Sequence, residues 1–157
     1  MDADDIAYPR RLEIQFKHME SDSEMMVCGS YSITIGATHK LLPAPQTYDE
    51  IKAQLLFKSP IFHPTAFIRL DFLNKNSLRY NPSFDKAEDY DFWRQVLKLG
   101  KSCNLSKPLL KYRVHPKQTN KEVQFTLANN IRETILFENL KIRKDEIPEA
   151  YYKTCSY

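Results

Sequence analysis

The sequence predicts an α/β domain in which helices flank a mixed β-sheet. Segments rich in β-branched residues alternate along the chain with segments whose apolar residues recur at helical spacing. The length of 157 residues is sufficient for one domain with a buried core. Because strand-like and helix-like segments are interleaved throughout, we expect a layered α/β arrangement.

The first helix is expected over residues 9–19, and a strand is expected over residues 26–35. The strand segment, M-V-C-G-S-Y-S-I-T-I, is rich in β-branched residues with partial alternation, and Gly36 follows it. Proline is tolerated in the first turn of the helix. The apolar residues of that helix recur at helical spacing, and they are Leu12, Phe16 and Met19.

A capping box at Thr47 and Glu50 predicts the start of a helix over residues 48–58, which Pro60 ends. In this T-x-x-E motif the hydroxyl and the carboxylate each satisfy a free backbone N–H. Residues 63–72 begin with an extended His-Pro step and are expected to form a short strand and then a helix.

A helix is also predicted over residues 89–99, after a loop at residues 74–82. Gly100 stands where a helix C-cap is expected. One face of this helix carries four apolar side chains, namely Phe92, Trp93, Val96 and Leu97.

Two short strands are expected at residues 102–105 and 109–114, on either side of Pro108. A second capping box at residues 119–122 predicts another helix. A short terminal helix is expected after Pro148. The helix after the second capping box is expected to contain the apolar positions Val123, Leu127, Ile131, Ile135 and Leu140.

Composition limits the classes of partner. Twenty-three Lys and Arg against twenty Asp and Glu give a net charge of +3, which is too small to indicate binding to nucleic acid. The three cysteines, Cys28, Cys103 and Cys155, are widely spaced, so neither a disulfide framework nor a C-x-x-C metal site is expected. No stretch approaches the roughly 20 apolar residues of a membrane span. We expect a cytoplasmic chain and leave peripheral association with the inner face of the membrane open.

Three carboxylates stand close together at the start of the chain, on Asp2, Asp4 and Asp5. Carboxylates at this spacing can hold a divalent cation whose other ligands are phosphate oxygens and water. The alternative is a solvated acidic tail. A calcium loop is excluded by the pattern, because Ile6 and Pro9 occupy positions that need oxygen ligands and no glycine turns the chain.

A second acidic cluster, A-E-D-Y-D-F-W, contains Glu88, Asp89 and Asp91 at the start of a predicted helix. Carboxylates in a first turn are stabilised by the helix dipole and often only cap the helix. A carboxylate that points into a cleft can instead act as a general base. Phe92 and Trp93 are expected to anchor the helix in the core, with the wall of a sugar pocket as the alternative.

Two histidines adjoin predicted strands and have two interpretations each. His115 closes the strand L-L-K-Y-R-V-H beside Arg113, and His63 precedes a proline. A histidine at the end of a strand can bind a metal or a phosphate group. The alternative in both cases is a surface histidine with ordinary hydrogen bonds.

Several motifs follow one another in a specific order. The order is D-A-D-D-I-x-x-P-x-R-L-E-x-Q, C-G-S, H-P-T-A, A-E-D-Y-D-F-W and G-K-x-x-N-L-x-x-P-L-L-x-Y-R-V-H-x-x-Q. This order resembles that of the family 2 glycosyltransferases, which have the GT-A fold. The resemblance covers residues 2 to about 120. It implies a partial GT-A-like fold.

The resemblance implies a metal site at the first acidic run. Asp2 and Asp4 correspond to the D-x-D pair that holds Mn or Mg against the diphosphate of a nucleotide-sugar, with Asp5 adjacent. His115 corresponds to a late histidine that approaches the metal or the diphosphate. Arg113 is expected to help stabilise negative charge on the leaving diphosphate.

The resemblance also implies a general base in the second acidic cluster. Asp89 corresponds to the base, with Glu88 beside it and Asp91 as the alternative. The base takes the proton of an acceptor hydroxyl whose oxygen attacks the anomeric carbon, and its position opposite the leaving group implies inversion. His63 is expected on the acceptor side, and Trp93 is a candidate wall of the sugar pocket.

Two segments are distinguished by the resemblance. Residues 1–120 are expected to form the C-terminal, metal-binding and acceptor-side part of a catalytic domain, and residues 121–157 a helical extension. Members of the family carry a nucleotide-binding βαβ half before the D-x-D motif, and this sequence lacks it. We therefore expect the isolated chain to be inactive and to pair with another copy or a partner through an exposed edge.

The expected activity is inverting transfer of a sugar from a nucleotide-sugar to a glycan or another hydroxyl acceptor, in polysaccharide or cell-surface glycan biosynthesis. The alternative is a non-catalytic module that binds the acceptor or complements a separate N-terminal half. A metal-dependent phosphatase is disfavoured, because the motifs that accompany its D-x-D are missing.

Overall fold

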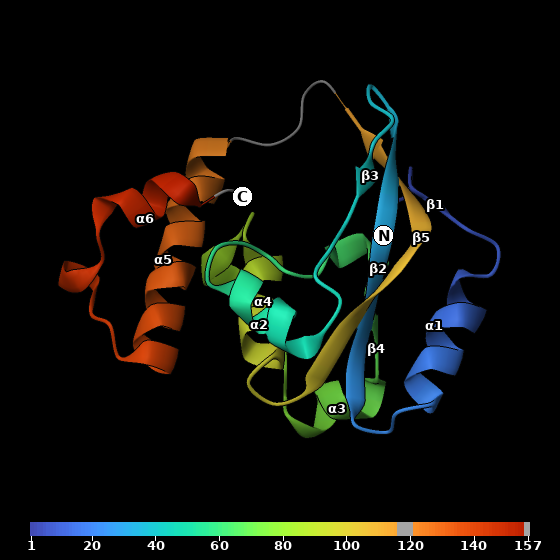
Figure 1. Ribbon diagram of the computed structural model, residues 1–157, viewed down its shortest axis with the longest axis horizontal. Helices are drawn as coiled ribbons and strands as arrows, with labels where there is room; N and C mark the ends of the chain where they lie inside the picture. The colour runs from blue at the N-terminus through green and yellow to red at the C-terminus, as the bar shows by residue number, and fades with distance from the viewer. Residues whose placement is uncertain (116–120, 156–157) are drawn as a thin grey trace.

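The computed structural model describes residues 1–115 and 121–155 and shows a mixed sheet with helices on both faces (Figure 1). The strands are β1 (Ile6–Ala7), β2 (Met25–Gly36), β3 (Leu41–Leu42), β4 (Phe67–Ile68) and β5 (Lys101–Val114). The α-helices are α1 (Arg11–Glu20), α2 (Tyr48–Leu55), α3 (Leu70–Lys75), α4 (Glu88–Val96), α5 (Lys121–Leu140) and α6 (Glu149–Thr154). Short 3-10 helices are η1 (His63–Thr65), η2 (Pro82–Phe84) and η3 (Lys144–Glu146).

The sheet is built around the long strands β2 and β5, which run parallel to each other. Strand β1 pairs antiparallel with β5, whereas β3 and β4 both pair antiparallel with β2. The strand order is β1-β5-β2-β3, with β4 also against β2. The predicted mixed sheet flanked by helices is confirmed, and it is compatible with a partial GT-A-like fold.

Helices α2 and α4 cover one face of the sheet and α1 covers the other (Figure 1). The larger core lies under α2 and α4, where Ile51, Trp93 and Val27 are fully buried. Helix α5 adds Ala128 and Ile131 to the same core. Helix α5 therefore packs directly on the rest of the molecule. The predicted division of the chain into two segments at residue 120 stays a prediction.

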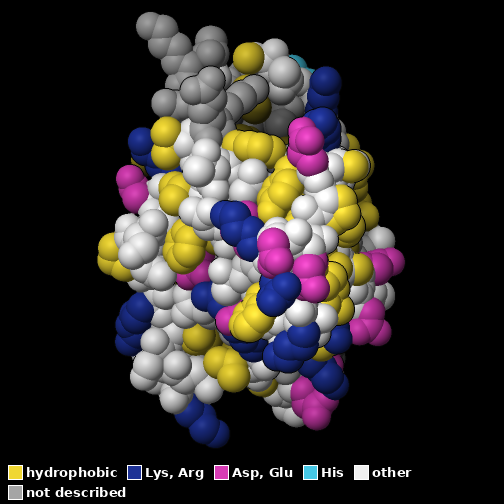
Figure 2. Space-filling view, turned by 90° about the vertical axis from the view of Figure 1, so that its left-hand side faces the viewer, with side chains coloured by type: hydrophobic (Ala, Val, Ile, Leu, Met, Phe, Trp, Pro, Cys, Tyr) yellow, Lys and Arg dark blue, Asp and Glu magenta, His cyan; other side chains and the backbone are white. Residues whose placement is uncertain are grey.

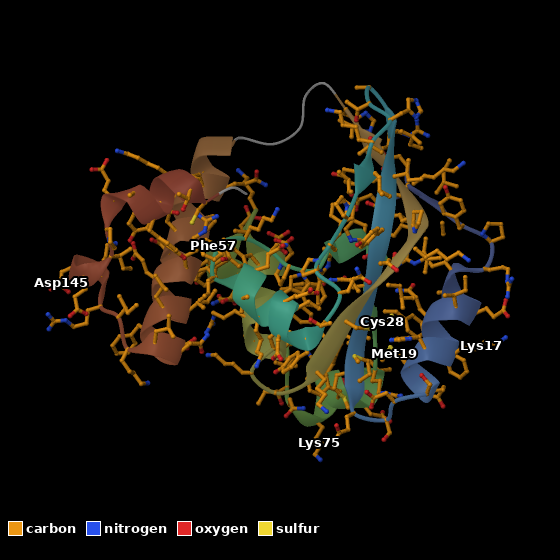
Figure 3. All side chains as sticks on the ribbon, in the orientation of Figure 1. Lys17, Met19, Cys28, Phe57, Lys75 and Asp145 are labelled. Atoms are coloured by element: carbon orange, nitrogen blue, oxygen red, sulfur yellow. The ribbon has the colours of Figure 1, made fainter. Side chains whose placement is uncertain are left out.

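A smaller core lies between α1 and the sheet. Met19 of α1 packs here with Cys28 of β2 and Cys103 of β5. Met19 and Cys28 lie near each other at this interface, whereas Lys17 points away from the sheet (Figure 3). Of Leu12, Phe16 and Met19, which recur at helical spacing in α1, only Met19 is buried, whereas Leu12 and Phe16 are exposed.

Most predicted elements are confirmed, including the first helix, the first long strand and the helices after residues 47, 87 and 148. The capping box of α2 forms as predicted: Oγ1 of Thr47 accepts a hydrogen bond from the backbone of Glu50 (3.3 Å), and the Glu50 carboxylate accepts one from the backbone of Thr47 (2.9 Å). Residues 63–72 contain the expected strand followed by a helix. The second capping box, at residues 119–122, lies outside the residues whose side chains the structure describes.

Two local predictions are wrong. The two short strands predicted around Pro108 form one strand, β5. Pro108 faces Tyr31 where the register between β5 and β2 shifts, so the missing N–H of the proline interrupts no regular ladder. The His63-Pro64 step, predicted as extended, starts η1, where a proline near the first turn loses no hydrogen bond.

The outer surface carries charges of both signs. Figure 2 shows the face over α5 and α6, where Lys and Arg side chains are interspersed with Asp and Glu side chains and with apolar groups. In the described part of the chain, none of the helices combines the length and apolar character that a membrane crossing requires.

Candidate functional site

The acidic run at the start of the chain is fixed against the end of β5. Asp5 is buried, and its Oδ1 accepts a hydrogen bond from the backbone N–H of Arg113 (3.1 Å). Its Oδ2 accepts one from the backbone N–H of Asp2 (3.3 Å). Of the three neighbouring carboxylates, Asp5 therefore acts as the structural one that holds the turn in place.

Asp4 contacts His115, which lies 111 positions later in the sequence. Nε2 of His115 lies 2.5 Å from Oδ2 of Asp4, and both side chains are about half exposed. The hydrogen bond from His115 lowers the pKa of the Asp4 carboxyl below its ordinary value. Nε of Arg113 donates to the backbone oxygen of Asp4 (3.1 Å), which fixes the turn from the other side.

Asp4 and His115 can supply some, but not all, of the ligands that a divalent cation needs. Carboxylate oxygen suits both Mn and Mg, whereas imidazole nitrogen fits Mn better than the harder Mg, and such ions keep several positions for water and phosphate oxygens. Among residues 1–115 and 123–155, the structure brings together no group of three or more His, Cys, Asp or Glu side chains that could hold a metal. Asp4 and His115 could therefore supply two ligands, with the exposed Asp2 close by in the sequence.

A pocket of about 600 Å³ lies beside the first turn of α4. Its walls come from η1, from the chain that leads into η2, and from the start of α4. Two of the predicted catalytic carboxylates, Glu88 and Asp89, face this pocket. The lining residues are His63, Tyr80, Asn81, Pro82, Asp85, Glu88 and Asp89.

His63 lies among aromatic rings at the wall of the pocket. Its ring centroid is 5.3 Å from that of Trp93 and 5.7 Å from that of Tyr80. Burial lowers the pKa of His63, and the charges of Asp89 and Glu88 oppose that shift. The α-amino group of Met1 also lowers this pKa and the Asp2 carboxylate raises it, so the acidic run and the pocket are coupled electrostatically.

Three of the sequence motifs meet to hold His63 in this position. Oγ1 of Thr65 accepts a hydrogen bond from the backbone N–H of Ser30 (3.1 Å) and donates to the backbone oxygen of Phe62 (2.7 Å). Nε2 of the buried Gln15 donates to the backbone oxygens of Thr65 (2.8 Å) and Cys28 (2.6 Å). The H-P-T, C-G-S and R-L-E-x-Q segments therefore form one hydrogen-bonded unit beneath the pocket.

The other residues of the second acidic cluster have different surroundings. Oδ1 of Asp89 accepts a hydrogen bond from the backbone N–H of Tyr90 (2.7 Å) in the first turn of α4. Asp91 is fully buried, where it pairs with Arg94 (2.8 Å) and accepts a hydrogen bond from Gln95 (2.8 Å). Trp93 is fully buried and packs in the main core.

Comparison with known proteins relates the chain to an enzyme class, although no protein-family model matches it. An uncharacterized glycosyltransferase of Haemophilus influenzae is 32% identical over 160 residues, which cover 92% of this chain and 50% of that protein. The O-antigen biosynthesis glycosyltransferase WbnJ of Escherichia coli is 37% identical over 126 residues (77% of this chain, 48% of that protein). The amylovoran biosynthesis glycosyltransferase AmsE of Erwinia amylovora is 30% identical over 125 residues (77% and 46%).

Over most of its length, the chain is a homologue of glycosyltransferases. This bears out the broader part of the sequence resemblance. The family 2 membership and the D-x-D assignment stay predictions. The chain spans about half the length of the curated relatives it matches.

The structure of this chain also shows residues at or beneath the pocket that the sequence analysis did not predict. Tyr80 lines the pocket and contacts His63, but it lies in a segment predicted only as a loop. Gln15 and Thr65 stand in motifs without an assigned role. Both side chains are uncharged and have apolar neighbours in the sequence, so no local pattern marked them. Their importance depends on hydrogen bonds to backbone groups that are distant in the sequence.

Proposed function

We propose that this protein is part of an inverting, metal-dependent glycosyltransferase. It transfers a sugar from a nucleotide-sugar to a hydroxyl of a glycan or similar acceptor, in polysaccharide or cell-surface glycan biosynthesis. The observation that carries the proposal is the contact of Asp4 with His115, 111 positions apart, in a chain that also has a pocket lined by two carboxylates. The names of the relatives WbnJ and AmsE support the biosynthetic context.

Asp4 and His115 hold the divalent cation in this proposal, and Asp2 is the third candidate ligand. A bound Mn or Mg would neutralise negative charge on the departing diphosphate. The backbone bonds of Asp5 and Arg113 keep the turn in the shape that presents Asp4.

Asp89 is the proposed general base. It faces the pocket, whereas Asp91 is buried in an ion pair with Arg94 and does not line the pocket. Asp89 accepts the proton of the acceptor hydroxyl as its oxygen attacks the anomeric carbon from the side opposite the diphosphate. Glu88, in the same pocket, contributes negative charge that favours binding of hydroxyl groups over anions.

Binding of Mn²⁺ to the chain tests the metal site. Electron paramagnetic resonance measures free Mn²⁺, first with protein alone and then after addition of uridine diphosphate. We expect binding that the nucleotide strengthens and that Asp4→Asn and His115→Gln both weaken. Asp145→Asn, which changes an exposed carboxylate near α6 (Figure 3), is the control and should bind as the native chain does. Equal binding by all variants would disprove the metal site.

The isolated chain is proposed to be inactive by itself. Because it spans about half the length of its relatives, we expect weak binding of nucleotide-sugars and no turnover. Hydrolysis or transfer of a nucleotide-sugar by these 157 residues with Mn²⁺ would overturn this part of the proposal. An acceptor-binding or complementing module is the alternative. It would bind glycosides in the pocket, with no change in Mn²⁺ binding upon Asp4→Asn.

The proposal also includes pairing with a second copy or a partner, and a cytoplasmic location at or near the membrane. Ile6 of the short strand β1 is exposed, as are Leu12 and Phe16 on α1, so apolar area is available for contact. Light scattering tests the pairing. A monodisperse monomer at high concentration would contradict it.

A further inference from the structure

The contact between His63 and Tyr80 sets the direction of a hydroxyl group in the pocket. Nε2 of His63 lies 2.9 Å from Oη of Tyr80. Nδ1 of His63 is buried and has no hydrogen-bond partner among the residues that the structure describes. Only one of the two ring nitrogens of a neutral imidazole carries a proton, so these two environments decide where that proton lies.

The surroundings favour a proton on Nε2. A buried N–H without an acceptor is rarer in proteins than a buried acceptor without a donor. A proton on Nδ1 would create such an N–H, whereas a proton on Nε2 is donated to Oη of Tyr80. Burial lowers the pKa of His63, which is consistent with the neutral ring that this reasoning requires.

If Oη of Tyr80 accepts this bond, its own hydrogen must be directed elsewhere. Tyr80 lines the pocket and about half of it is exposed, so its hydroxyl hydrogen is available to a molecule in the pocket. The ring is held in place by Phe92, at a centroid distance of 4.9 Å, and by His63. Burial and the charges of Asp89 and Glu88 raise the pKa of Tyr80, which keeps the hydroxyl protonated.

The pocket therefore combines one oriented donor with carboxylate acceptors. Neighbouring hydroxyl groups of a sugar offer both donors and acceptors, so a carbohydrate can satisfy Tyr80, Asp89 and Glu88 together. A phosphate or carboxylate ligand would satisfy Tyr80 but would be repelled by Asp89 and Glu88.

We propose that Tyr80 is a positioning residue that donates a hydrogen bond to an oxygen of a carbohydrate acceptor, with its hydroxyl oriented by His63. The inference rests on the proposed transferase function, because it uses Asp89 as the group that receives the acceptor proton. Tyr80 fixes the sugar so that one of its hydroxyl groups faces Asp89.

The tautomer of His63 provides the first test. Nitrogen-15 NMR of the chain distinguishes a protonated from an unprotonated ring nitrogen, and His63→Gln identifies the signals among the four histidines. We expect the proton on Nε2 of His63. A proton on Nδ1 would overturn the proposal, since Tyr80 would then donate to His63 and not to a ligand.

The second test uses methyl glycosides of hexoses and N-acetylhexosamines as probes, in NMR titrations of the native chain. We expect shifts at pocket residues and, for Tyr80→Phe, roughly a tenfold loss of affinity, the size expected for one hydrogen bond. Tyr80→Phe retains the ring that packs on Phe92. Tyr152→Phe, whose hydroxyl donates to Glu133 on α5, is the control and should bind as the native chain does.

Two results would contradict the proposal. One is equal affinity of Tyr80→Phe and the native chain, and the other is the absence of shifts at the pocket with every glycoside. Both are independent of the Mn²⁺ measurement, which depends on Asp4 and His115. Failure of the metal site with glycoside binding intact would therefore remove the metal from the proposed function and leave the hydrogen bond from Tyr80 to the sugar standing.

Discussion

A β-carbon at Gly29 would lie 2.0 Å from Oδ1 of Asn104. The two residues are partners in the register between β2 and β5. The amide of Asn104 donates to the backbone oxygens of Pro45 (2.7 Å) and Pro60 (3.1 Å). The absence of a side chain at Gly29 thus leaves the room in which Asn104 joins two turns to the centre of the sheet.

Gly29→Ala is therefore expected to lower the free energy of unfolding by about 2 kcal/mol, because the added methyl group overpacks the site. Urea denaturation measures this change. Asn104→Ala removes the clashing oxygen, so the double variant should lose less stability than the sum of the two single variants. Additive losses would contradict the steric explanation.

Gln15→Met is expected to lower the free energy of unfolding by about 3 kcal/mol, because it leaves buried polar groups without partners. Gln15 is fully buried, donates to Cys28 and Thr65, and accepts a hydrogen bond from Arg11 (3.0 Å). The same denaturation experiment on Lys17→Gln, an exposed change in the same helix, should give a difference within about 0.5 kcal/mol. A similar effect of both variants would show that the buried contacts of Gln15 contribute little.

Substitutions of Asp89 and Asp91 should cause different defects, one in the pocket and the other in stability. Asp91→Ala removes the fully buried partner of Arg94 and Gln95 while Arg94 keeps its pair with Glu138, so we expect a cost of about 2 kcal/mol of stability. Asp89→Asn keeps an oxygen that can accept from the backbone N–H of Tyr90 and is expected to cost less than about 1 kcal/mol. Thermal or urea unfolding separates the two, and glycoside titration of Asp89→Asn reports on the pocket. A strongly destabilised Asp89→Asn would contradict this difference and show that Asp89 has a structural role like that of Asp91.

The contact of Asp4 with His115 predicts a pH dependence. The pKa of Asp4 is lowered from 3.8, chiefly by the hydrogen bond from His115. A carboxyl with a lowered pKa in the folded state contributes stability above its unfolded pKa and loses that contribution as the pH falls through the folded value. We expect the carboxyl carbon signal of Asp4 to titrate below pH 3.8 in NMR, and His115→Gln to raise that midpoint. His39→Gln is the control, and an equal shift in both variants would contradict the contact.

Local sequence signals were sufficient for many of the elements because the interactions that form them are also local. The capping box of α2 joins residues three positions apart, and the apolar face of α4 repeats within one helix. The strand break predicted at Pro108 was wrong, because the rule against proline in a strand considers only neighbouring residues in the sequence. The register shift opposite Tyr31, which makes proline acceptable, depends on another strand.

The residues of the candidate site also differ in how far the sequence could predict them. The motif order pointed to the acidic run, the cluster at Glu88 to Asp91 and the late histidine, because their residue types are those that the chemistry needs. It ranked Asp4 above Asp5 and Asp89 above Asp91, but it gave no physical reason for either order. These pairs differ in burial and in hydrogen bonds to distant residues, such as the backbone of Arg113 for Asp5.

The sequence by itself determined the α/β class, most of the element positions and the resemblance to glycosyltransferases, since periodicity, capping and motif order are properties of the chain. Only the tertiary structure decided which carboxylates line the pocket and which are buried, that Tyr80 belongs to the pocket, and that Gln15 and Asn104 join segments distant in the sequence. The physical reason is that burial and hydrogen bonding between distant segments arise only when β2 and β5 bring those segments together.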